Sequence, residues 1–455
     1  PASLCWQWYN ELKEKFAVLA AIQRSEYDWE RCEVLIASLD TAKRRPHCDI
    51  IQEIPYDLLI VDEAHKLKNP NTRNWQFVNS IKKKYFLMLT ATPVQNDLKE
   101  LYTLITLLKP GQLGTYADFQ RQFMVDKRMP RNTNALRQLL SQVMIRNRRG
   151  QTALEFTKRH VYAIPIDFSP GEQEAYDKLT LVMRESARTW GGLSAGALSL
   201  ITLQREICSS PLAAAVTLQK LMDNTGDAPM AKSLESLLNA VLACQTCSKA
   251  DMLVNIVASI NDKVIVFTEY RATQQYLRMR LEQAGLATLG FDGSLSASRK
   301  DWMRELFRKT GQVLVSTESG GEGLNFQFAC HVINYDLPWN PMRLEQRIGR
   351  VHRLGQTRDV HIYNMATNGT IEEHILFLLY EKINMFNLVI GELDVILAQL
   401  GRGTGLERKL YRIAAEAVDD PSLWEDRLRE LASDFLGAQD KVRAQAQQAD
   451  RWLTW

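Results

Sequence analysis

Short apolar runs alternate with helical patterns in two separate stretches of the chain. The runs lie at residues 34–37, 58–61 and 86–89 in the first stretch and at 264–267, 313–315 and 332–335 in the second. Each run is continuously apolar rather than alternating with polar residues, which is typical of parallel strands buried on both faces. The pattern therefore predicts two α/β layers.

Helical periodicity fills much of the remaining chain. It covers residues 166–247, with an interruption rich in glycine, serine and alanine at 191–199, and a polar helical stretch from residue 396 on. The 455 residues are too many for one ordinary core. We therefore predict a first α/β lobe, a helical insertion, a second α/β lobe and a helical tail. Their predicted bounds are residues 1–165, 166–247, 248–395 and 396–455.

Two helix starts can be read from capping residues. Asp97 with Glu100 three positions later forms a capping-box pattern, and a Pro-Gly pair ends the helix that follows. The apolar face of that helix would consist of Leu101, Leu104, Ile105 and Leu108. Farther on, Asn340 precedes a proline, which is favoured in a first helical turn because its missing N–H would be unpaired there anyway. We predict helices after Asp97 and after Asn340.

Composition excludes several classes of protein. Hydrophobic residues make up 45% and charged residues 24% of the chain, which are ordinary values for a globular protein rather than a disordered one. No apolar run reaches the roughly 18 residues that a membrane span needs. The N-terminus shows no charged leader before an apolar block. We therefore expect a cytoplasmic protein without a membrane partner.

The net charge and the cysteine content exclude few further classes of protein. The net charge of +3, from 56 basic and 53 acidic residues, is too balanced to indicate nucleic acid by itself. The seven cysteines are scattered, which suits reduced thiols in the cytosol. Cys244 and Cys247 form a CxxC pair, but no second pair completes a zinc site, so we favour ordinary thiols there.

The strongest single signal is the segment DLLIVDEAHKLKN at residues 57–69. An apolar strand there delivers two adjacent carboxylates, Asp62 and Glu63, at its carboxyl end, where open α/β sheets bind ligands. Nucleotide hydrolysis needs a carboxylate to hold Mg²⁺ and a second group to position the attacking water. Two solvated acids in a turn are the alternative, which the strand followed by Asp-Glu-Ala-His disfavours.

This segment and LTATPVQNDLKELYTLITLLKPG after it resemble superfamily-two helicase-like ATPases that contain a DEAH box, and specifically the Swi/Snf-type branch. The resemblance continues in PASLCWQWYNE before them and in VMIRNRRG, VIVFTEY, FDGSLS, STESGGEGLNFQFACHVINYDLPWNP and EQRIGRVHRLGQ after them, in the family's order. It implies an α/β fold of two RecA-like parallel-sheet lobes, with ATP and Mg²⁺ in the cleft between them. Compact lobes suit a bacterial or archaeal member.

The resemblance also implies roles for particular residues. Asp62 would hold the metal and act with Glu63 in catalysis, while Arg350 and Arg353 would reach the γ-phosphate as arginine fingers. The other implied residues are His65, Gly321, Gly323 and Gln346 for nucleotide binding, Thr317, Asn325 and Trp339 for nucleic acid, and Thr90 and Thr92 for coupling the two sites. Gln346, Arg350 and Arg353 are spaced i, i+4 and i+7, which predicts that one helical face carries all three.

Several of these residues also have a purely structural interpretation. Trp339 is equally a buried aromatic at a helix start. The glycines at 320–323 are, taken alone, a flexible turn. Thr90 and its neighbours are small enough to pack a strand end, and the two arginines could lie on a solvated basic face. His65 is expected to link the lobes around ATP rather than to bind metal.

A phosphate-binding loop is missing from the sequence. The pattern Gly-x-x-x-x-Gly-Lys-Ser/Thr does not occur, and neither does the dipeptide Gly-Lys. In the family this loop precedes the PASLCWQW-like segment and grips the phosphates and Mg²⁺. We favour a truncated chain as the explanation for the missing loop. A split enzyme is the second explanation and a degenerate scaffold the third. We expect the first lobe to be incomplete, to expose an apolar sheet edge and to be the less stable lobe, and we expect the chain alone to be inactive.

The function implied by the resemblance is ATP-driven translocation on double-stranded DNA, with remodelling of DNA-bound protein complexes such as RNA polymerase. The protein would be associated with the nucleoid in a bacterium. Tracking of the backbone would make DNA binding sensitive to salt and largely independent of sequence. Two alternatives stay open: an RNA-directed DEAH-type helicase, which TPVQN and HRLGQ disfavour, and a non-enzymatic scaffold that docks DNA or protein.

Overall fold

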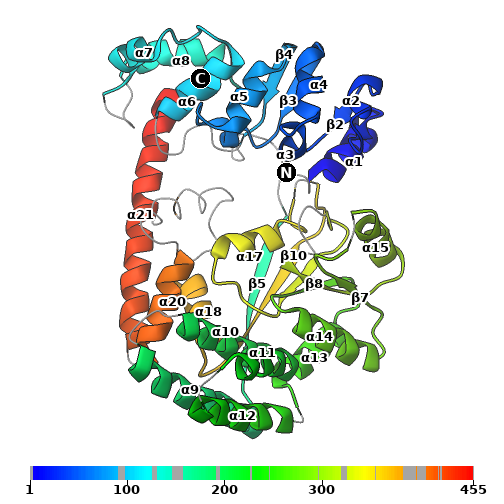
Figure 1. Cartoon of the computed structure of the whole chain (residues 1–455), viewed down its shortest axis with the longest axis vertical. Helices are drawn as coiled ribbons and strands as arrows, with labels where there is room; N and C mark the ends of the chain where they lie inside the picture. Colours follow the sequence, from blue (N-terminus) through cyan, green and yellow to red (C-terminus); the bar gives the residue numbers. More distant parts are fainter. Residues whose placement is uncertain are drawn as a thin grey trace. The chain divides into compact units, whose positions relative to one another are not determined.

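The computed structural model describes residues 4–90, 98–125, 131–145, 157–190, 195–225, 228–244, 246–295, 297–318, 325–353, 355–382, 396, 406–418, 420 and 423–453. The chain forms two compact units. The first comprises residues 1–153 with 442–455, and the second comprises residues 154–441. Figure 1 labels most helices and strands of both units.

The first unit contains a parallel pair of strands, β3 (Tyr56–Val61) and β4 (Lys83–Met88), and a shorter parallel pair, β1 (Ala21–Ile22) and β2 (Leu35–Ile36). Strands β2, β3 and β4 fall on the three predicted apolar runs. The described helices of this unit are α1 (Cys5–Phe16), α2 (Asp28–Arg31), α3 (Leu39–Ala42), α4 (His47–Glu53), η2 (Ala64–Leu67), α5 (Arg73–Ser80), α6 (Leu98–Leu108), α7 (Tyr116–Phe123) and α8 (Thr133–Ser141). The predicted helix after Asp97 is thus present as α6, although Asp97 itself lies outside the described residues.

Strands β3 and β4 are covered on one face only by the described part of the chain. Leu59 and Phe86 on that face pack against apolar side chains of α4, α5 and α6. The opposite face carries exposed apolar side chains, namely Leu58, Ile60, Tyr85 and Leu87, which are 40–62% exposed. The prediction that these strands are buried on both faces is therefore wrong. The apolar surface that we expected at a sheet edge lies on a sheet face.

The second unit is built on a six-stranded sheet in the order β5-β10-β9-β6-β8-β7, and every neighbouring pair is parallel. Its strands are β5 (Arg159–Ile166), β6 (Val264–Thr268), β7 (Thr288–Phe291), β8 (Val313–Thr317), β9 (His331–Asn334) and β10 (Val360–Thr367). Every residue of β6 and β8 is buried. One face packs against α13 (Ser248–Ser259) and α14 (Arg271–Gln283). The predicted α/β class with a parallel sheet is confirmed.

Strand β5 differs from the prediction, which assigned residues up to 165 to the first lobe. It pairs with β10 over its whole length, from Arg159 opposite Val360 to Ile166 opposite Thr367. The Arg159 guanidinium also donates to the Glu345 carboxylate at 3.0 Å and to His352 Nδ1 at 3.0 Å. Strand β5 is therefore an edge strand of the second sheet, and its bonding partners follow it in the sequence by about 200 residues.

Four helices follow β5 and occupy the stretch predicted to be helical. They are α9 (Pro170–Trp190), α10 (Ala195–Ser209), α11 (Pro211–Asn224) and α12 (Ala228–Ala243). The buried carboxylate of Glu172 joins the two ends of this segment. It accepts hydrogen bonds from the amide of Ser169 at 2.8 Å, and from the amide and hydroxyl of Ser248 at 3.0 and 2.5 Å. One side chain therefore holds the entry and the exit of the helical segment together.

The remaining described helices complete the second unit and the end of the chain. They are α15 (Ala297–Lys309), α17 (Pro341–Ile348), α18 (Ile371–Phe377), the π-helical turn η4 (Leu378–Lys382), α20 (Leu406–Glu416) and α21 (Leu423–Leu453). The predicted tail is helical where the structure describes it. Among all the residues that the structure describes, no helix combines the length and the apolar character that a bilayer crossing requires.

Candidate functional site

The acidic pair lies immediately beyond the carboxyl end of β3, as predicted. Asp62 and Glu63 are both half-buried. The indole Nε1 of Trp8 on α1 donates to Asp62 Oδ2 at 3.0 Å, and the amide of Glu63 donates to Asp62 Oδ1 at 2.8 Å. Two hydrogen bonds from different parts of the chain therefore fix the orientation of the Asp62 carboxylate.

Glu63 has a left-handed backbone, with φ 53° and ψ 45°, which is uncommon for a residue with a side chain. This conformation ends the strand sharply and begins η2. The Glu63 carboxylate faces His65, and the Oε2–Nδ1 distance is 3.0 Å. His65, which we expected to link two lobes around ATP, thus contacts the neighbouring catalytic candidate.

Leu89, the residue before the coupling candidate Thr90, is bonded to the acidic turn through the backbone. The amide of Leu89 donates to Val61 O at 2.9 Å, and the amide of Ala64 donates to Leu89 O at 2.9 Å. The two bonds extend the β3–β4 pairing to the residue before Thr90. Thr92, the second coupling candidate, lies outside the described residues.

The Asp62 carboxylate fits a water-mediated Mg²⁺ ion. Mg²⁺ prefers oxygen ligands and usually keeps several waters. Each oxygen of Asp62 accepts one hydrogen bond in the structure, which leaves acceptor capacity on both, and the half-exposed side chain is accessible to water. The lysine that would neutralise the phosphates is the missing part of the donor set, because the sequence has no Gly-Lys dipeptide.

The arginine candidates follow helix α17 rather than lie on it. Asn340 caps the helix by accepting from the amide of Met342 at 3.0 Å, which confirms the predicted start. The helix ends at Ile348, so Arg350 and Arg353 lie in the turn beyond it. The prediction of one helical face carrying Gln346 and both arginines is therefore wrong. Gln346 is exposed on the helix, and both arginines are half-exposed.

The turn that carries the arginines is fixed by main-chain bonds. The amide of Phe326 donates to Arg350 O at 2.9 Å, and Arg353 Nε donates to Gly349 O at 2.6 Å. Arg347, which sequence reasoning missed, anchors the helix below the turn. Its buried guanidinium donates to Asp336 O at 2.7 Å and lies over the ring of Phe267. Burial lowers the pKa of Arg347, while nearby carboxylates oppose that effect.

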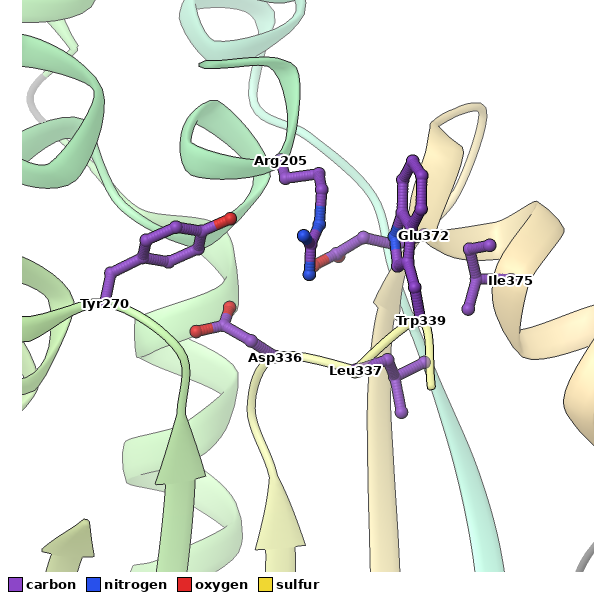
Figure 2. A pocket seen from close by; sticks show the side chains of 7 residues that line it. All are labelled: Arg205, Tyr270, Asp336, Leu337, Trp339, Glu372 and Ile375. Carbon is purple, nitrogen blue, oxygen red and sulfur yellow. The ribbon is translucent and has the colours of Figure 1, made fainter. Parts of the chain in front are cut away.

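Trp339 is buried, with 3% of its surface exposed. The Arg205 guanidinium lies 4.9 Å from its ring centre, and the ring of Tyr411 lies 4.3 Å away. Figure 2 shows Arg205 pointing between Asp336 and Trp339 in a small pocket. The structural interpretation of Trp339, as a buried aromatic at a helix start, is the one that agrees with this arrangement. A direct nucleic-acid contact would require Trp339 to leave its neighbours.

The other two nucleic-acid candidates, Thr317 and Asn325, differ in their exposure to solvent. Thr317 is buried at the end of β8, with 4% of its surface exposed. Asn325 is half-exposed and exchanges two hydrogen bonds with Gln327, one from Asn325 Nδ2 to Gln327 Oε1 at 3.0 Å and one from the Gln327 amide to Asn325 Oδ1 at 3.1 Å. The nucleotide-binding candidates Gly321 and Gly323 lie outside the described residues.

Two further site residues were missed because their partners are distant in sequence. Trp8 lies in the PASLCWQWYNE segment, whose resemblance to the family was a signal, but nothing in it pointed to Asp62. Lys249 forms a buried ion pair with Glu372 close to Asp336. Both carboxylates lie at the carboxyl edge of the sheet, where strands β9 and β10 end.

Glu206 on α10 is a buried acid whose Oε2 lacks a hydrogen-bond partner among the described residues. Burial raises its pKa from 4.5 to about 7. Between these values the unfolded chain gives up its proton first, so the stability of the folded unit falls as the pH rises through this window. Replacing Glu206 with glutamine should raise the free energy of unfolding at pH 8 by up to about 3 kcal/mol and have little effect at pH 4.

Urea unfolding at both pH values measures this effect. Glu235→Gln, on the exposed face of α12, is the matched control and should show no such pH-dependent gain. An equal fall in stability from pH 4 to pH 8 in wild type and Glu206→Gln would contradict the assignment.

Comparison with known proteins identifies the family. The model of the SNF2-related domain matches residues 1–213, and that of the helicase conserved C-terminal domain matches residues 248–355. The uncharacterized ATP-dependent helicase YqhH of Bacillus subtilis is 51% identical over 403 residues, which cover 88% of this chain and 72% of YqhH. The chain belongs to the SNF2-related family of ATP-dependent helicases. The family predicted from the motifs is confirmed.

The chain is also similar to proteins at lower sequence identity. The DNA repair and recombination protein RDH54 of Saccharomyces cerevisiae is 30% identical over 360 residues, which cover 74% of this chain and 38% of RDH54. Among solved structures, the Sulfolobus solfataricus SWI2/SNF2 ATPase core in complex with dsDNA is 21% identical, with a TM-score of 0.37. The match covers 88% of this chain and 83% of that one.

Proposed function

We propose that this SNF2-related chain is part of an ATP-driven translocase that moves on double-stranded DNA and remodels protein complexes bound to it. The observation that carries the proposal is the acidic pair, Asp62 and Glu63, held at the carboxyl end of β3 and joined to the strand before Thr90 by backbone hydrogen bonds. In a family of ATP-dependent helicases, this arrangement suits hydrolysis coupled to movement.

Each of the candidate residues would have its own role in ATP hydrolysis. Asp62, oriented by Trp8, would hold Mg²⁺ through water, and the ion would neutralise charge on the phosphates. Glu63 would position the attacking water and accept its proton, with His65 holding the carboxylate in place. Arg350 and Arg353 would stabilise the charge that spreads over the transferring phosphoryl group.

Duplex DNA is the proposed track because RDH54, a relative at 30% identity, is named as a DNA repair and recombination protein. Binding would depend on phosphate contacts and would weaken as salt rises. The proposed location is the bacterial cytoplasm, at the nucleoid, and RNA polymerase is one DNA-bound complex that could be displaced. An RNA-directed helicase and a scaffold that docks DNA or protein without hydrolysis are the competing functions.

ATP hydrolysis with duplex DNA, with RNA and without nucleic acid tests the proposal. The chain is assayed as it stands and in a version extended at its N-terminus by a Gly-x-x-x-x-Gly-Lys-Ser/Thr loop segment. We expect DNA-stimulated hydrolysis in the extended version and none in the chain alone. Glu63→Gln should lower the stimulated rate by about a hundredfold or more, because it removes the proton acceptor.

Glu53→Gln is the matched control, because Glu53 is an exposed acid at the end of α4 and should not affect hydrolysis. Stimulation by RNA instead of duplex DNA would favour the RNA-directed helicase. DNA binding that does not depend on ATP, together with DNA binding by Glu63→Gln equal to that of the wild type, would favour the scaffold and overturn the proposal.

A further inference from the structure

Three side chains with metal-binding chemistry meet at the amino edge of the six-stranded sheet. Asp262 lies two residues before β6, Cys330 directly precedes β9, and His331 is the first residue of β9. Strands β6 and β9 are hydrogen-bonded neighbours, with His331 opposite Val264. The parallel pairing therefore brings the three residues together, although Asp262 and Cys330 are 68 positions apart in the sequence.

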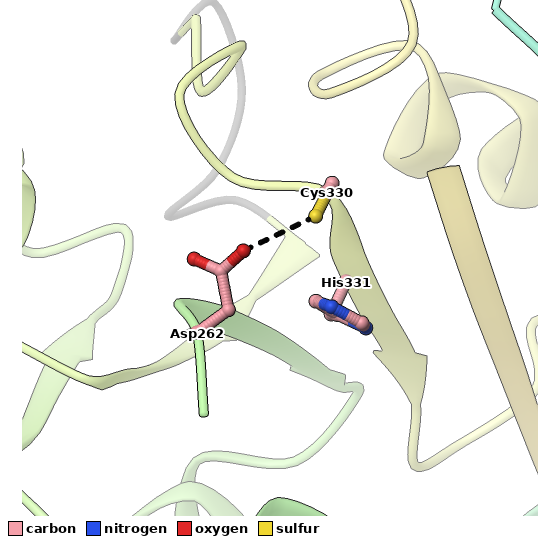
Figure 3. Close-up of side chains that lie close together, drawn as sticks. All are labelled: Asp262, Cys330 and His331. Carbon is pink, nitrogen blue, oxygen red and sulfur yellow. Dashed lines mark hydrogen bonds between the residues drawn. The ribbon is translucent and has the colours of Figure 1, made fainter. Parts of the chain in front are cut away.

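The geometry of the group is that of a small binding site. One potential ligand atom from each residue lies within 4.8 Å of the other two. Cys330 Sγ is 3.4 Å from Asp262 Oδ2, and Figure 3 shows the imidazole of His331 next to both side chains. Cys330 is 5% exposed, while Asp262 and His331 are half-exposed. Solvent therefore reaches the group from the side of the aspartate and the histidine.

We propose that Asp262, Cys330 and His331 bind a divalent transition-metal ion of the zinc class. Sulfur, imidazole nitrogen and carboxylate oxygen together are typical ligands of Zn²⁺, whereas Mg²⁺ and Ca²⁺ prefer oxygen ligands alone. Three protein ligands leave the fourth position of a tetrahedral ion to solvent, which the exposure of the group allows. The thiolate and the carboxylate would balance the two positive charges of the ion.

Neighbouring aromatic side chains fix the orientation of the proposed histidine ligand. The ring of His361 stacks on that of His331 with centres 5.0 Å apart and planes 15° apart. The hydroxyl of Tyr363 lies 3.4 Å from His331 Nδ1. Such supporting contacts around a ligating histidine tune its orientation and its affinity for the metal. Burial and the neighbouring His361 lower the pKa of His331, so the neutral form that ligates metal is favoured.

Binding requires two local changes, both of which the structure allows. Burial raises the pKa of the Cys330 thiol to about 11, so the sulfur carries a proton that is released to solvent as the metal–sulfur bond forms. No atom is oxidised or reduced. Arg358 pairs with Asp262 Oδ2 at 2.5 Å and must turn away from this oxygen. Its side chain is 45% exposed, and its guanidinium can keep its hydrogen bond to a second acceptor, Phe328 O, at 2.7 Å.

This site is independent of the proposed ATPase chemistry. None of the three proposed ligands has a role in the proposed hydrolysis, although the segment before Cys330 is bonded to the turn that carries Arg350, through the Phe326 amide and Arg350 O at 2.9 Å. The CxxC pair that the sequence suggested is not part of the group: Cys247 is buried near Tyr335 instead.

Cobalt(II) is the probe that tests the proposal, because a cysteine ligand gives Co²⁺ a sulfur-to-metal charge-transfer absorption. The chain is freed of metal with a chelator, titrated with Co²⁺ and then with Zn²⁺, without ATP or DNA. We expect one Co²⁺ per chain, the charge-transfer band, and displacement by Zn²⁺. Cys330→Ser should remove the band, and His331→Gln should weaken binding at least about tenfold.

Cys244→Ser is the control, because Cys244 is a half-buried thiol outside the group and should leave the titration unchanged. Asp262→Asn is a second variant that keeps the shape of the side chain, and in it the rise in melting temperature that Zn²⁺ gives the wild type should disappear. Failure to bind Co²⁺, or a band that survives in Cys330→Ser, would overturn the proposal. Neither result depends on whether the chain hydrolyses ATP.

Discussion

Replacing Arg350 with alanine is expected to lower DNA-stimulated ATP hydrolysis by about a thousandfold in the loop-extended chain, while nucleotide affinity changes little. An arginine that contacts the γ-phosphate mainly in the transition state affects the rate rather than binding. The substitution keeps the main-chain bond from the Phe326 amide to the oxygen of residue 350, which helps to fix this turn. Steady-state kcat and the dissociation constant of an ATP analogue measure the two quantities.

Two further variants make this result interpretable. Arg350→Lys keeps the charge but loses the planar fork, so its rate should fall between the wild type and Arg350→Ala. Arg308→Ala removes a guanidinium that is 63% exposed on α15 and should leave the rate unchanged. A normal kcat in Arg350→Ala would refute the role assigned to this arginine.

Replacing Lys249 with methionine is expected to destabilise the second unit by about 3–5 kcal/mol, because it leaves a buried carboxylate without its partner. Lys249 is 2% exposed, and its ammonium lies 2.5 and 2.7 Å from the two oxygens of Glu372. Burial alone would lower the pKa of Lys249, but Glu372 and Asp336 raise it on balance. Denaturant unfolding of the wild type and the variant measures the loss.

The double variant Lys249→Met with Glu372→Gln should recover most of this stability. It removes both charges and keeps an acceptor for the amide of Thr367, which bonds Glu372 at 3.1 Å. Lys178→Met is the control, because Lys178 forms an exposed i,i+4 pair with Glu174 that should contribute at most about 1 kcal/mol. If Lys249→Met were no more destabilising than this control, the buried pair would not be a structural element of the unit.

Three inner strands of the second sheet, β6, β8 and β9, were predictable because they are continuously apolar, whereas β5, β7 and β10 were not predicted. The runs beginning at Val264 and Val313 correspond to β6 and β8, which are buried at every position. The same pattern gave the wrong burial for β3 and β4, since Leu58 and Leu87 are about half exposed. An apolar run shows that a residue can be buried, but which face is covered depends on segments far away in the sequence.

The candidate site was predictable in its residues and less so in its geometry. The motifs located Asp62, Glu63 and Arg350, but periodicity alone could not show that α17 ends at Ile348 and puts the arginines in a turn. The bond between Trp8 and Asp62 spans 54 positions, and that between Lys249 and Glu372 spans 123. Such contacts are set by the assembled fold, so no local sequence pattern indicates them.

The hydrogen bonds of Glu172 have a consequence for how this protein can evolve. Ser169 and Ser248, the residues that flank the helical segment, are held by one carboxylate, so the sheet meets that segment at a fixed point of attachment. Mutations that lengthen, shorten or replace helices between these anchors need not displace β5 or α13. The segment is therefore a place where natural variation can add new contacts with other molecules while the sheet is inherited unchanged.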